Sequence, residues 1–170
     1  APEEGREDPI AKGNRFFGDL LMRFDALPVT TIGVIEGAAF GGGLGLTCVF
    51  DVTICMADTR FALSETGLGV VPAQIAPFVV RRLGLTMARR IALTGARFDG
   101  KHAFDIGLVH FLVNNADELA ETLAKVLKGV GRCAPRANAA TKKVLLDTAL
   151  RPMAEVLDDA SKAFASQLRG

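Results

Sequence analysis

Hydrophobic positions in the first part of the chain follow two different patterns. Between Asp8 and Phe24 they recur every three or four residues, which is typical of one face of a helix. Asp8 and Pro9 are residue types that favour an N-cap and the first helical position. From Val29 to Ile35 the side chains are mostly β-branched or apolar, which indicates a buried strand. We therefore expect a helix followed by a strand of the core.

The middle of the chain alternates short apolar runs with glycine and proline. A glycine triplet is followed by an apolar, helix-like segment, and two β-rich runs come after it. A stretch punctuated by Gly and Pro then indicates a loop, and two short helical patterns meet at Gly84. The expected elements are the apolar segment at 44–50, strands at 51–56 and 60–63, a loop at 67–77, and helices at 76–83 and 85–93.

The last third of the chain is expected to be mainly helical. A short helix and a short strand are followed by three segments whose apolar positions recur at three- and four-residue steps. The expected elements are a helix at 101–105, a strand at 108–113, and helices at 117–130, 135–150 and 152–168. We accordingly divide the chain into a core portion at 1–113 and a helical C-terminal region at 114–170.

Composition narrows the class of protein. Of the 170 residues, 49% are hydrophobic and 23% are charged, which excludes a largely disordered chain. The net charge of +1 gives no electrostatic reason to expect nucleic acid or an anionic membrane as a partner. No apolar run reaches the roughly 18 residues of a membrane helix, and the polar N-terminus is unlike a signal peptide. Because that opening lacks an initiating Met, we expect the chain to begin inside a longer protein.

Cysteine and histidine give no sign of a disulfide framework or a metal site. Cys48, Cys55 and Cys133 are odd in number and have no zinc-ligand spacing, so we expect reduced thiols in a cytoplasmic protein. Cys48 and Cys55 stand in apolar surroundings, which favours core packing over a nucleophilic role. His102 and His110 lie far from any carboxylate-rich cluster, so no metal is expected.

Two segments carry candidate chemistry. Gly41, Gly42 and Gly43 stand between a buried strand and a helix, where free N–H groups and the helix dipole can stabilise an oxyanion. Taken alone, this pattern favours a tight turn with close packing, and it fits neither a phosphate loop nor a dinucleotide fingerprint. Glu65 is a lone carboxylate in an apolar, glycine-rich stretch and is a candidate for moving protons. Taken alone, it is more often a solvated loop acid or a helix cap.

In combination, these segments resemble the crotonase superfamily of enoyl-CoA hydratases and isomerases. The glycine triplet is followed some twenty residues later by Phe61-Ala62-Leu63-Ser64-Glu65, and several further motifs keep a fixed order from about Leu27 onward. Those motifs are Gly67-Leu68-Gly69, Pro72, Arg81-Arg82-Leu83-Gly84, Ala92-Leu93-Thr94-Gly95 and Ala103-Phe104-Asp105-Ile106-Gly107-Leu108-Val109.

The resemblance implies an α/β fold, a partial crotonase-type spiral of ββα units with a C-terminal helical region, and assembly as trimers or hexamers. It implies an acyl-CoA thioester as substrate and no separate cofactor, with the carbonyl held by two backbone N–H groups. Gly42 matches the second donor. The first comes, in the family, from an Ala-x-Ala-Asp loop, and no such loop precedes Gly41 here. We therefore expect these 170 residues alone not to form a complete active site.

Site residues follow from the same resemblance. Glu65 matches the second of the two glutamates that hydratases of the family commonly use, whereas Gly45 stands where the first belongs. Residues 71–82 resemble hydratases for branched glutaconyl thioesters, of the methylglutaconyl-CoA and isohexenylglutaconyl-CoA type. We expect Gly45 to leave space for a substrate branch or carboxyl group. The expected catalytic residues are Glu65 and Gly42, and the expected substrate contacts are Phe40, Gly41, Gly43, Gly45, Pro72 and Gln74.

Other possibilities remain open at this stage. An isomerase also needs only one carboxylate, and the glycine at position 45 is compatible with a fold kept as a non-catalytic assembly module. Four arginines are available for the CoA phosphates, although a solvated helix face is the alternative, at least for two of them: Arg81, Arg82, Arg89 and Arg90. Three C-terminal lysines are expected either to cap the CoA or to face a neighbouring subunit: Lys142, Lys143 and Lys162.

Overall fold

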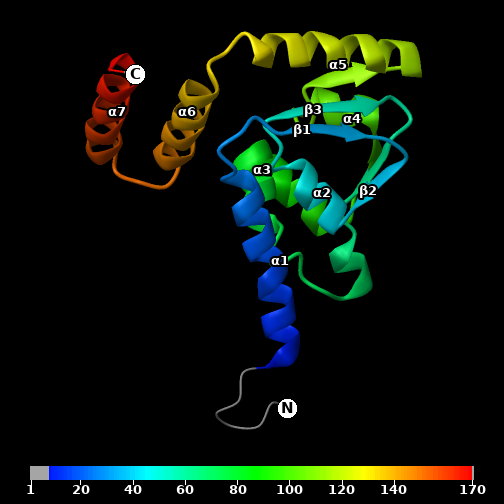
Figure 1. Ribbon diagram of the computed structural model, residues 1–170. Coiled ribbons are helices and arrows are strands. Elements are labelled where there is room, and N and C mark those ends of the chain that lie inside the picture. The colour runs from blue at the N-terminus through cyan, green and yellow to red at the C-terminus, as the bar shows by residue number, and fades with distance from the viewer. Residues whose placement is uncertain (1–7, 170) are drawn as a thin grey trace.

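The computed structural model describes residues 8–169 and forms two small sheets with helices around them (Figure 1). Strands β1 (Ile32–Ile35), β3 (Val52–Met56) and β6 (Phe111–Val113) make a parallel sheet in the order β1-β3-β6. Strands β2 (Ala38–Phe40), β4 (Arg60–Ala62) and β5 (Arg97–Asp99) make the second sheet, in which β4 pairs parallel to β2 and antiparallel to β5.

From β1 to β4 the chain alternates between the two sheets and adds a helix after each pair of strands. β1 and β2 are followed by α2 (Gly42–Thr47), and β3 and β4 are followed by the 3₁₀ helix η1 (Glu65–Leu68) and by α3 (Ala76–Thr94). This succession is the ββα repeat expected from the resemblance, and the α/β crotonase-type fold is confirmed. In α3 the backbone is non-helical at Gly84, where the sequence predicts a joint between two helices.

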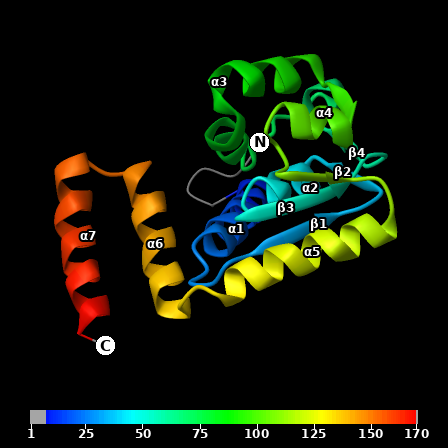
Figure 2. The ribbon, with the colours of Figure 1, turned by 90° about the horizontal axis from the view of Figure 1, so that it is seen from above.

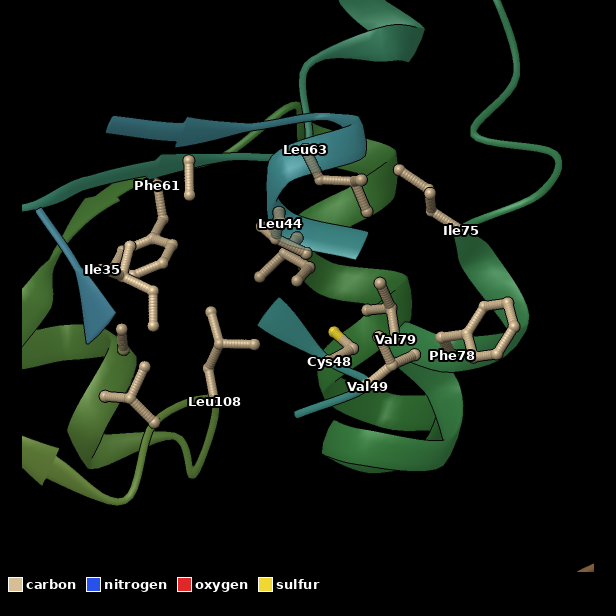
Figure 3. Packing of buried hydrophobic residues seen from close by; sticks show 14 of the residues in the cluster. Ile35, Leu44, Cys48, Val49, Phe61, Leu63, Ile75, Phe78, Val79 and Leu108 are labelled. Carbon is tan, nitrogen blue, oxygen red and sulfur yellow. The ribbon is translucent and has the colours of Figure 1, made fainter. Parts of the chain in front are cut away.

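The hydrophobic core lies where the two sheets meet α2 and α3. Ile35 comes from the first sheet and Phe61 from the second, and their side chains approach one another (Figure 3). Leu44, Leu63 and Ile75 pack beside them, and all three are almost fully buried. The glycine corner before α2 and the segment that carries Glu65 are therefore both attached to the same rigid core.

Helix α1 (Pro9–Asp25) projects from this core (Figure 1). Asp8 caps its first turn by accepting a hydrogen bond from the Ile10 N–H at 2.8 Å, and Pro9 occupies the first position, as predicted. Leu21 is fully buried, whereas Ile10 and Phe16 are 80% and 72% exposed. Only one face of the helix near its C-terminal half is therefore packed against the core.

Helix α4 (Gly100–Asp105) contacts β4, β5 and β6 in the core portion, and the C-terminal region consists of α5 (Ala116–Gly131), α6 (Pro135–Thr148) and α7 (Met153–Leu168). Helices α6 and α7 form an antiparallel hairpin that stands beside the core in both views (Figures 1 and 2). Lys142 of α6 attaches the hairpin to the core, because its Nζ donates to Asp51 Oδ2 at 2.8 Å and to the Val29 carbonyl at 3.2 Å. No helix within residues 8–169 is long and apolar enough to span a membrane.

Candidate functional site

A cavity of about 510 Å³ lies where α1, α2, η1 and the loop before α3 meet. Gly42 and Glu65, the two expected catalytic residues, both line it. The rest of the wall is mainly apolar and is made by Asn14, Phe17, Val70, Val71, Pro72, Ala73, Gln74 and Ile75. The fold thus brings one carboxylate and one helix N-terminal amide to a single small-molecule space.

The Glu65 side chain is held in place while one of its oxygens lacks a partner. Glu65 is the first residue of η1, and its backbone carbonyl accepts a hydrogen bond from the Val70 N–H at 3.0 Å. Oε2 is inaccessible to solvent and has no hydrogen-bond partner within residues 8–169. A buried oxygen of this kind is costly to leave unsatisfied, by about 1–3 kcal/mol. Glu65 is therefore prepared to bind a water molecule or a substrate atom that supplies the missing partner.

The backbone at Gly41 makes room for that carboxylate. Gly41 has φ +49°, and its N–H donates to the Ala62 carbonyl at 2.9 Å, which fixes the corner to β4. A Cβ at this position would lie 2.7 Å from Glu65 Oε1. The absence of a side chain is thus required twice, for the positive φ and for the close approach of the carboxylate.

Gly42 begins α2, so its N–H belongs to the first turn and has no acceptor inside the helix. Phe17 of α1 packs over it, and a Cβ at residue 42 would lie 3.1 Å from the end of that ring. A helix amide that opens into a mostly apolar cavity can donate to an oxygen that gains negative charge, while a neighbouring carboxylate moves a proton. The site therefore has the two groups needed to act on a polarised carbonyl compound.

The other expected substrate contacts divide into two groups. Pro72 and Gln74 line the cavity, and Gly41 touches Glu65. Phe40 and Gly43 do not line it. Phe40 points away on β2, 42% exposed, with the Arg97 guanidinium 5.9 Å from its ring centre. The carbonyl of Gly43 accepts a hydrogen bond from Thr47 Oγ1 at 2.9 Å, within α2.

The expected space at Gly45 is not there. Gly45 is buried, and a Cβ on it would overlap the side chain of Ile75 and lie 3.7 Å from Leu21 Cδ1. The volume that a glutamate side chain would need is filled by these two apolar residues. The expectation that Gly45 leaves room for a substrate branch is therefore wrong, and the glycine instead permits close packing of α2 against Ile75.

Helix α1 contributes site residues that the sequence analysis did not identify. Asn14 and Phe17 lie on one stripe of this helix and face the cavity. The residues Val70, Val71, Ala73 and Ile75 were also missed, although they flank the predicted Pro72 and Gln74. A helical pattern predicts that α1 has an apolar face but not which part of the fold that face covers. In the sequence, Gly18 could have indicated that this part of the helix packs closely against another segment, because it is a glycine inside a helix beside Phe17.

Three of the four arginines considered for the CoA phosphates have structural partners, and the weakest contacts are those of Arg90, to His102 Nε2 at 3.4 Å and Met87 Sδ at 3.8 Å. Arg82 donates to the Leu108 carbonyl at 3.0–3.1 Å and to Thr53 Oγ1 at 3.0 Å, and burial lowers the pKa of its guanidinium. Arg81 forms a short ion pair with Asp25. The three C-terminal lysines are also paired, Lys142 with Asp51, Lys143 with Asp147 and Lys162 with Asp159.

Thiol and metal chemistry find no support at this site. Cys48 and Cys55 are buried, as expected, and burial raises the pKa of their thiols to about 12 and about 11. Thiols with such pKa values are poor nucleophiles near neutral pH. In the part of the chain from residue 8 to residue 169, His, Cys, Asp and Glu side chains form no group that could hold a metal ion.

Comparison with known proteins places the whole chain in one family. The enoyl-CoA hydratase/isomerase family model matches residues 4–169. The enoyl-CoA hydratase AFT6-1 of Alternaria alternata is 35% identical over 130 residues, which cover 76% of this chain and 44% of that protein. The carnitinyl-CoA dehydratase of Proteus mirabilis is 32% identical over 145 residues, covering 85% of this chain and 55% of that protein. The chain thus spans about half the length of these curated relatives.

Solved structures agree with this placement. AtuE of Pseudomonas aeruginosa superimposes with a TM-score of 0.93 at 52% identity, covering 95% of this chain and 62% of that one. An enoyl-CoA hydratase/isomerase of Marinobacter aquaeolei gives a TM-score of 0.95 at 45% identity, covering 100% of this chain and 64% of the other. The fold, the motif order and the family match lead to one conclusion: the chain belongs to the enoyl-CoA hydratase/isomerase family.

Proposed function

We propose that the protein is an enoyl-CoA hydratase for a branched acyl group of the 3-methylglutaconyl or isohexenylglutaconyl type. The observation that carries the proposal is the buried Glu65 Oε2, which has no hydrogen-bond partner within residues 8–169, together with the position of Glu65 and Gly42 in the wall of one cavity. A structural carboxylate would be paired or solvated. An unpartnered one beside an amide donor suits a site that binds water and a thioester.

Each group has a defined task in the proposed reaction. The Gly42 N–H donates to the thioester oxygen, which polarises the carbonyl and makes the β-carbon electrophilic. Glu65 accepts a proton from water as the water oxygen forms a bond to the β-carbon. The electron pair of the double bond moves onto the α-carbon and the thioester oxygen. Glu65 then returns its proton to the α-carbon, so the net change is addition of one water molecule.

The branched substrate is supported by the sequence of residues 71–82 and by the shape of the site. A second cavity of about 320 Å³ shares Ala73 and Gln74 with the cavity that holds Glu65. The two spaces together can take an acyl group larger than a linear four-carbon chain. This second cavity, rather than the position of Gly45, is where we place the substrate branch.

Replacing Glu65→Gln tests the assignment of the acid/base. The variant keeps the size of the side chain but cannot accept the proton, so we expect the hydration rate with 3-methylglutaconyl-CoA to fall by about 100-fold or more. Glu36→Gln is the matched control, because Glu36 is exposed and outside the cavity. Full activity of Glu65→Gln would remove the residue from the mechanism.

An isomerase is the second candidate function. Glu65 is the one titratable side chain in the wall of the cavity, and a single carboxylate is enough to move a proton between two carbons. A peroxisomal dienoyl-CoA isomerase of Arabidopsis thaliana is 35% identical over 119 residues, which supports this alternative. Turnover in ¹⁸O-labelled water separates the two reactions, because only hydration incorporates the label into the product.

We also propose that the protein works in the cytoplasm as a trimer or as a hexamer made of two trimers. The C-terminal hairpin supports assembly, because Leu157, Phe164 and Leu168 of α7 are 61–74% exposed. Helices α6 and α7 would then serve as a trimerisation region that also caps the CoA. The mass in solution, measured by analytical ultracentrifugation, checks this proposal, and a monomer at micromolar concentration would contradict it.

A further inference from the structure

The second cavity, of about 320 Å³, has charged and polar groups in an otherwise apolar wall. It shares Ala73 and Gln74 with the wall of the Glu65 cavity, and its apolar side is formed by residues such as Met22 and Phe78. Two guanidinium groups, those of Arg15 and Arg81, also line it. This cavity adjoins the proposed reaction site and is lined by two cationic side chains and an amide. Such a cavity can distinguish substrates by their charge.

Arg15 and Gln74 converge above Gly18 of α1. A Cβ on residue 18 would overlap Gln74 Oε1 and would lie 3.0 Å from Arg15 Nη1. Gly18 is buried beneath these two side chains. The glycine therefore allows the Gln74 amide to lie directly on the helix, with the Arg15 guanidinium beside it.

The two arginines differ in how strongly they are already engaged. Arg81 forms its ion pair with Asp25, whose side chain is only 15% exposed, and its guanidinium lies 5.3 Å from the centre of the Phe78 ring. Arg15 pairs with Asp19 at 2.7 Å, but the two side chains are 53% and 51% exposed, and exposed pairs contribute little. Among residues 8–169, its Nη2 contacts only the weakly accepting sulfur of Met22, at 3.9 Å. Arg15 is thus the cation that can still bind an anion from a ligand.

We propose that Arg15 and Gln74 bind a free carboxylate at the distal end of a dicarboxylic acyl group whose thioester lies at Gly42 and Glu65. This rests on the proposed function, because it assumes that the acyl group enters the Glu65 cavity. A planar guanidinium with several N–H donors matches a carboxylate, and an amide NH₂ adds a further donor. The pair then selects dicarboxylic thioesters over monocarboxylic ones of the same length.

Binding of two saturated, unreactive thioesters tests the inference in the full-length protein. Glutaryl-CoA carries the distal carboxylate, and butyryl-CoA lacks it. By isothermal titration calorimetry we expect Arg15→Gln to weaken glutaryl-CoA binding about 10- to 100-fold, as for loss of a charged hydrogen-bonded contact, and to leave butyryl-CoA binding unchanged. Arg23→Gln, on the same helix but outside both cavities, should change neither affinity. Equal effects of Arg15→Gln on the two ligands, or none, would overturn the inference.

Gln74→Glu provides a second test that does not depend on removing a side chain. The substitution keeps the shape of the amide and adds a negative charge, so it should repel glutaryl-CoA at least about tenfold while butyryl-CoA still binds. Unchanged circular dichroism and the retained affinity for butyryl-CoA show that the variant is folded. If Gln74→Glu binds glutaryl-CoA as well as the parent protein does, the carboxylate does not lie there.

The binding assay and the hydration assay test the carboxylate site and the hydratase proposal separately. If the protein prefers glutaryl-CoA through Arg15 but adds no water to 3-methylglutaconyl-CoA, the carboxylate site stands and the hydratase proposal falls. If the protein hydrates 3-methylglutaconyl-CoA and 3-methylcrotonyl-CoA through Glu65 with the same preference in Arg15→Gln as in the parent, the hydratase proposal stands and the carboxylate site falls.

Discussion

At Gly41 the backbone and the candidate catalytic side chain occupy neighbouring space. The residue combines a positive φ with the close approach of Glu65 Oε1. Its neighbour Gly42 presents an amide to the cavity, so a shift of this corner moves the donor and the carboxylate together. The relative position of these two groups therefore depends on a glycine that itself takes no part in proton transfer.

Gly41→Ala is expected to reduce both activity and stability. The added Cβ forces the Glu65 carboxylate to move, which should lower kcat about tenfold or more, because small misplacements of reacting groups are costly. The left-handed φ should cost a further 1–2 kcal/mol, roughly, in the free energy of unfolding. Steady-state kinetics and urea denaturation measure the two effects.

Gly37→Ala separates the clash from the backbone strain. Gly37 also has a positive φ, of +69°, but a Cβ there would meet nothing within 4 Å. We expect a similar loss of stability with kcat preserved. An equal fall in kcat for both variants would mean that the approach of Glu65 to residue 41 does not matter.

Because Cys48 is buried, the free energy of unfolding should depend on pH in the alkaline range. Burial raises the pKa of this thiol from 9.0 to about 12, so between these values the folded state keeps a proton that the unfolded chain releases. Stability must then fall as pH rises above 9, by at most about 1.4 kcal/mol per pH unit for this group. In urea denaturation from pH 8 to 10.5, Cys48→Ala should show a smaller slope than the parent. Cys133→Ala is the control. Cys133 is exposed, so its replacement should leave the slope unchanged.

At the scale of elements, the hydrophobic pattern located the helices well and the shortest strands poorly. The helix expected between residues 8 and 24 is α1, and the joint expected at Gly84 is a residue with φ 74° and ψ 159° inside α3. Strands β2 and β5 were not predicted, because β2 adjoins the glycine triplet and β5 has a charged residue at each end, so neither has a run of apolar residues typical of a strand. The strand expected from 108 begins at Phe111, since Leu108 and Val109 are buried in the preceding loop.

The attachment of the α6–α7 hairpin depends on polar contacts that the pattern does not show. Lys142 is 13% exposed and joins α6 to Asp51 and to the Val29 carbonyl. We expect Lys142→Met to lower the free energy of unfolding by about 1–3 kcal/mol, because Asp51 loses a charged partner. Hydrogen exchange should rise in α6 and α7 more than in the core.

Lys143→Met is the matched control on the adjacent residue. Lys143 pairs with Asp147 in the same helix, but its side chain is 70% exposed, so its loss should change stability by less than about 0.5 kcal/mol. If the two variants are equally stable, the contact between Lys142 and Asp51 does not hold the hairpin to the core.

At the scale of the whole molecule, the site is assembled from three stretches that are distant in the chain: part of α1, the start of α2, and residues 65–75. Resemblance predicted that Gly42 and Glu65 meet, and the structure places both at one cavity. The helix α1 was predicted, but its position over the site, with Asn14, Arg15 and Phe17, was not, because long-range packing leaves no periodic pattern in one sequence. The filled space at Gly45 was missed for the same reason, since Ile75 lies thirty residues further along the chain.

A structure of the Glu65→Gln protein with bound 3-methylglutaconyl-CoA tests the central claim most directly. The account predicts that the thioester oxygen lies 2.7–3.2 Å from the Gly42 nitrogen, roughly the length of a hydrogen bond. It also predicts that the β-carbon lies within about 4 Å of the residue 65 side chain, directly or through one water molecule. A thioester bound outside the cavity that Gly42 and Glu65 line, or one whose oxygen points away from the start of α2, would contradict it.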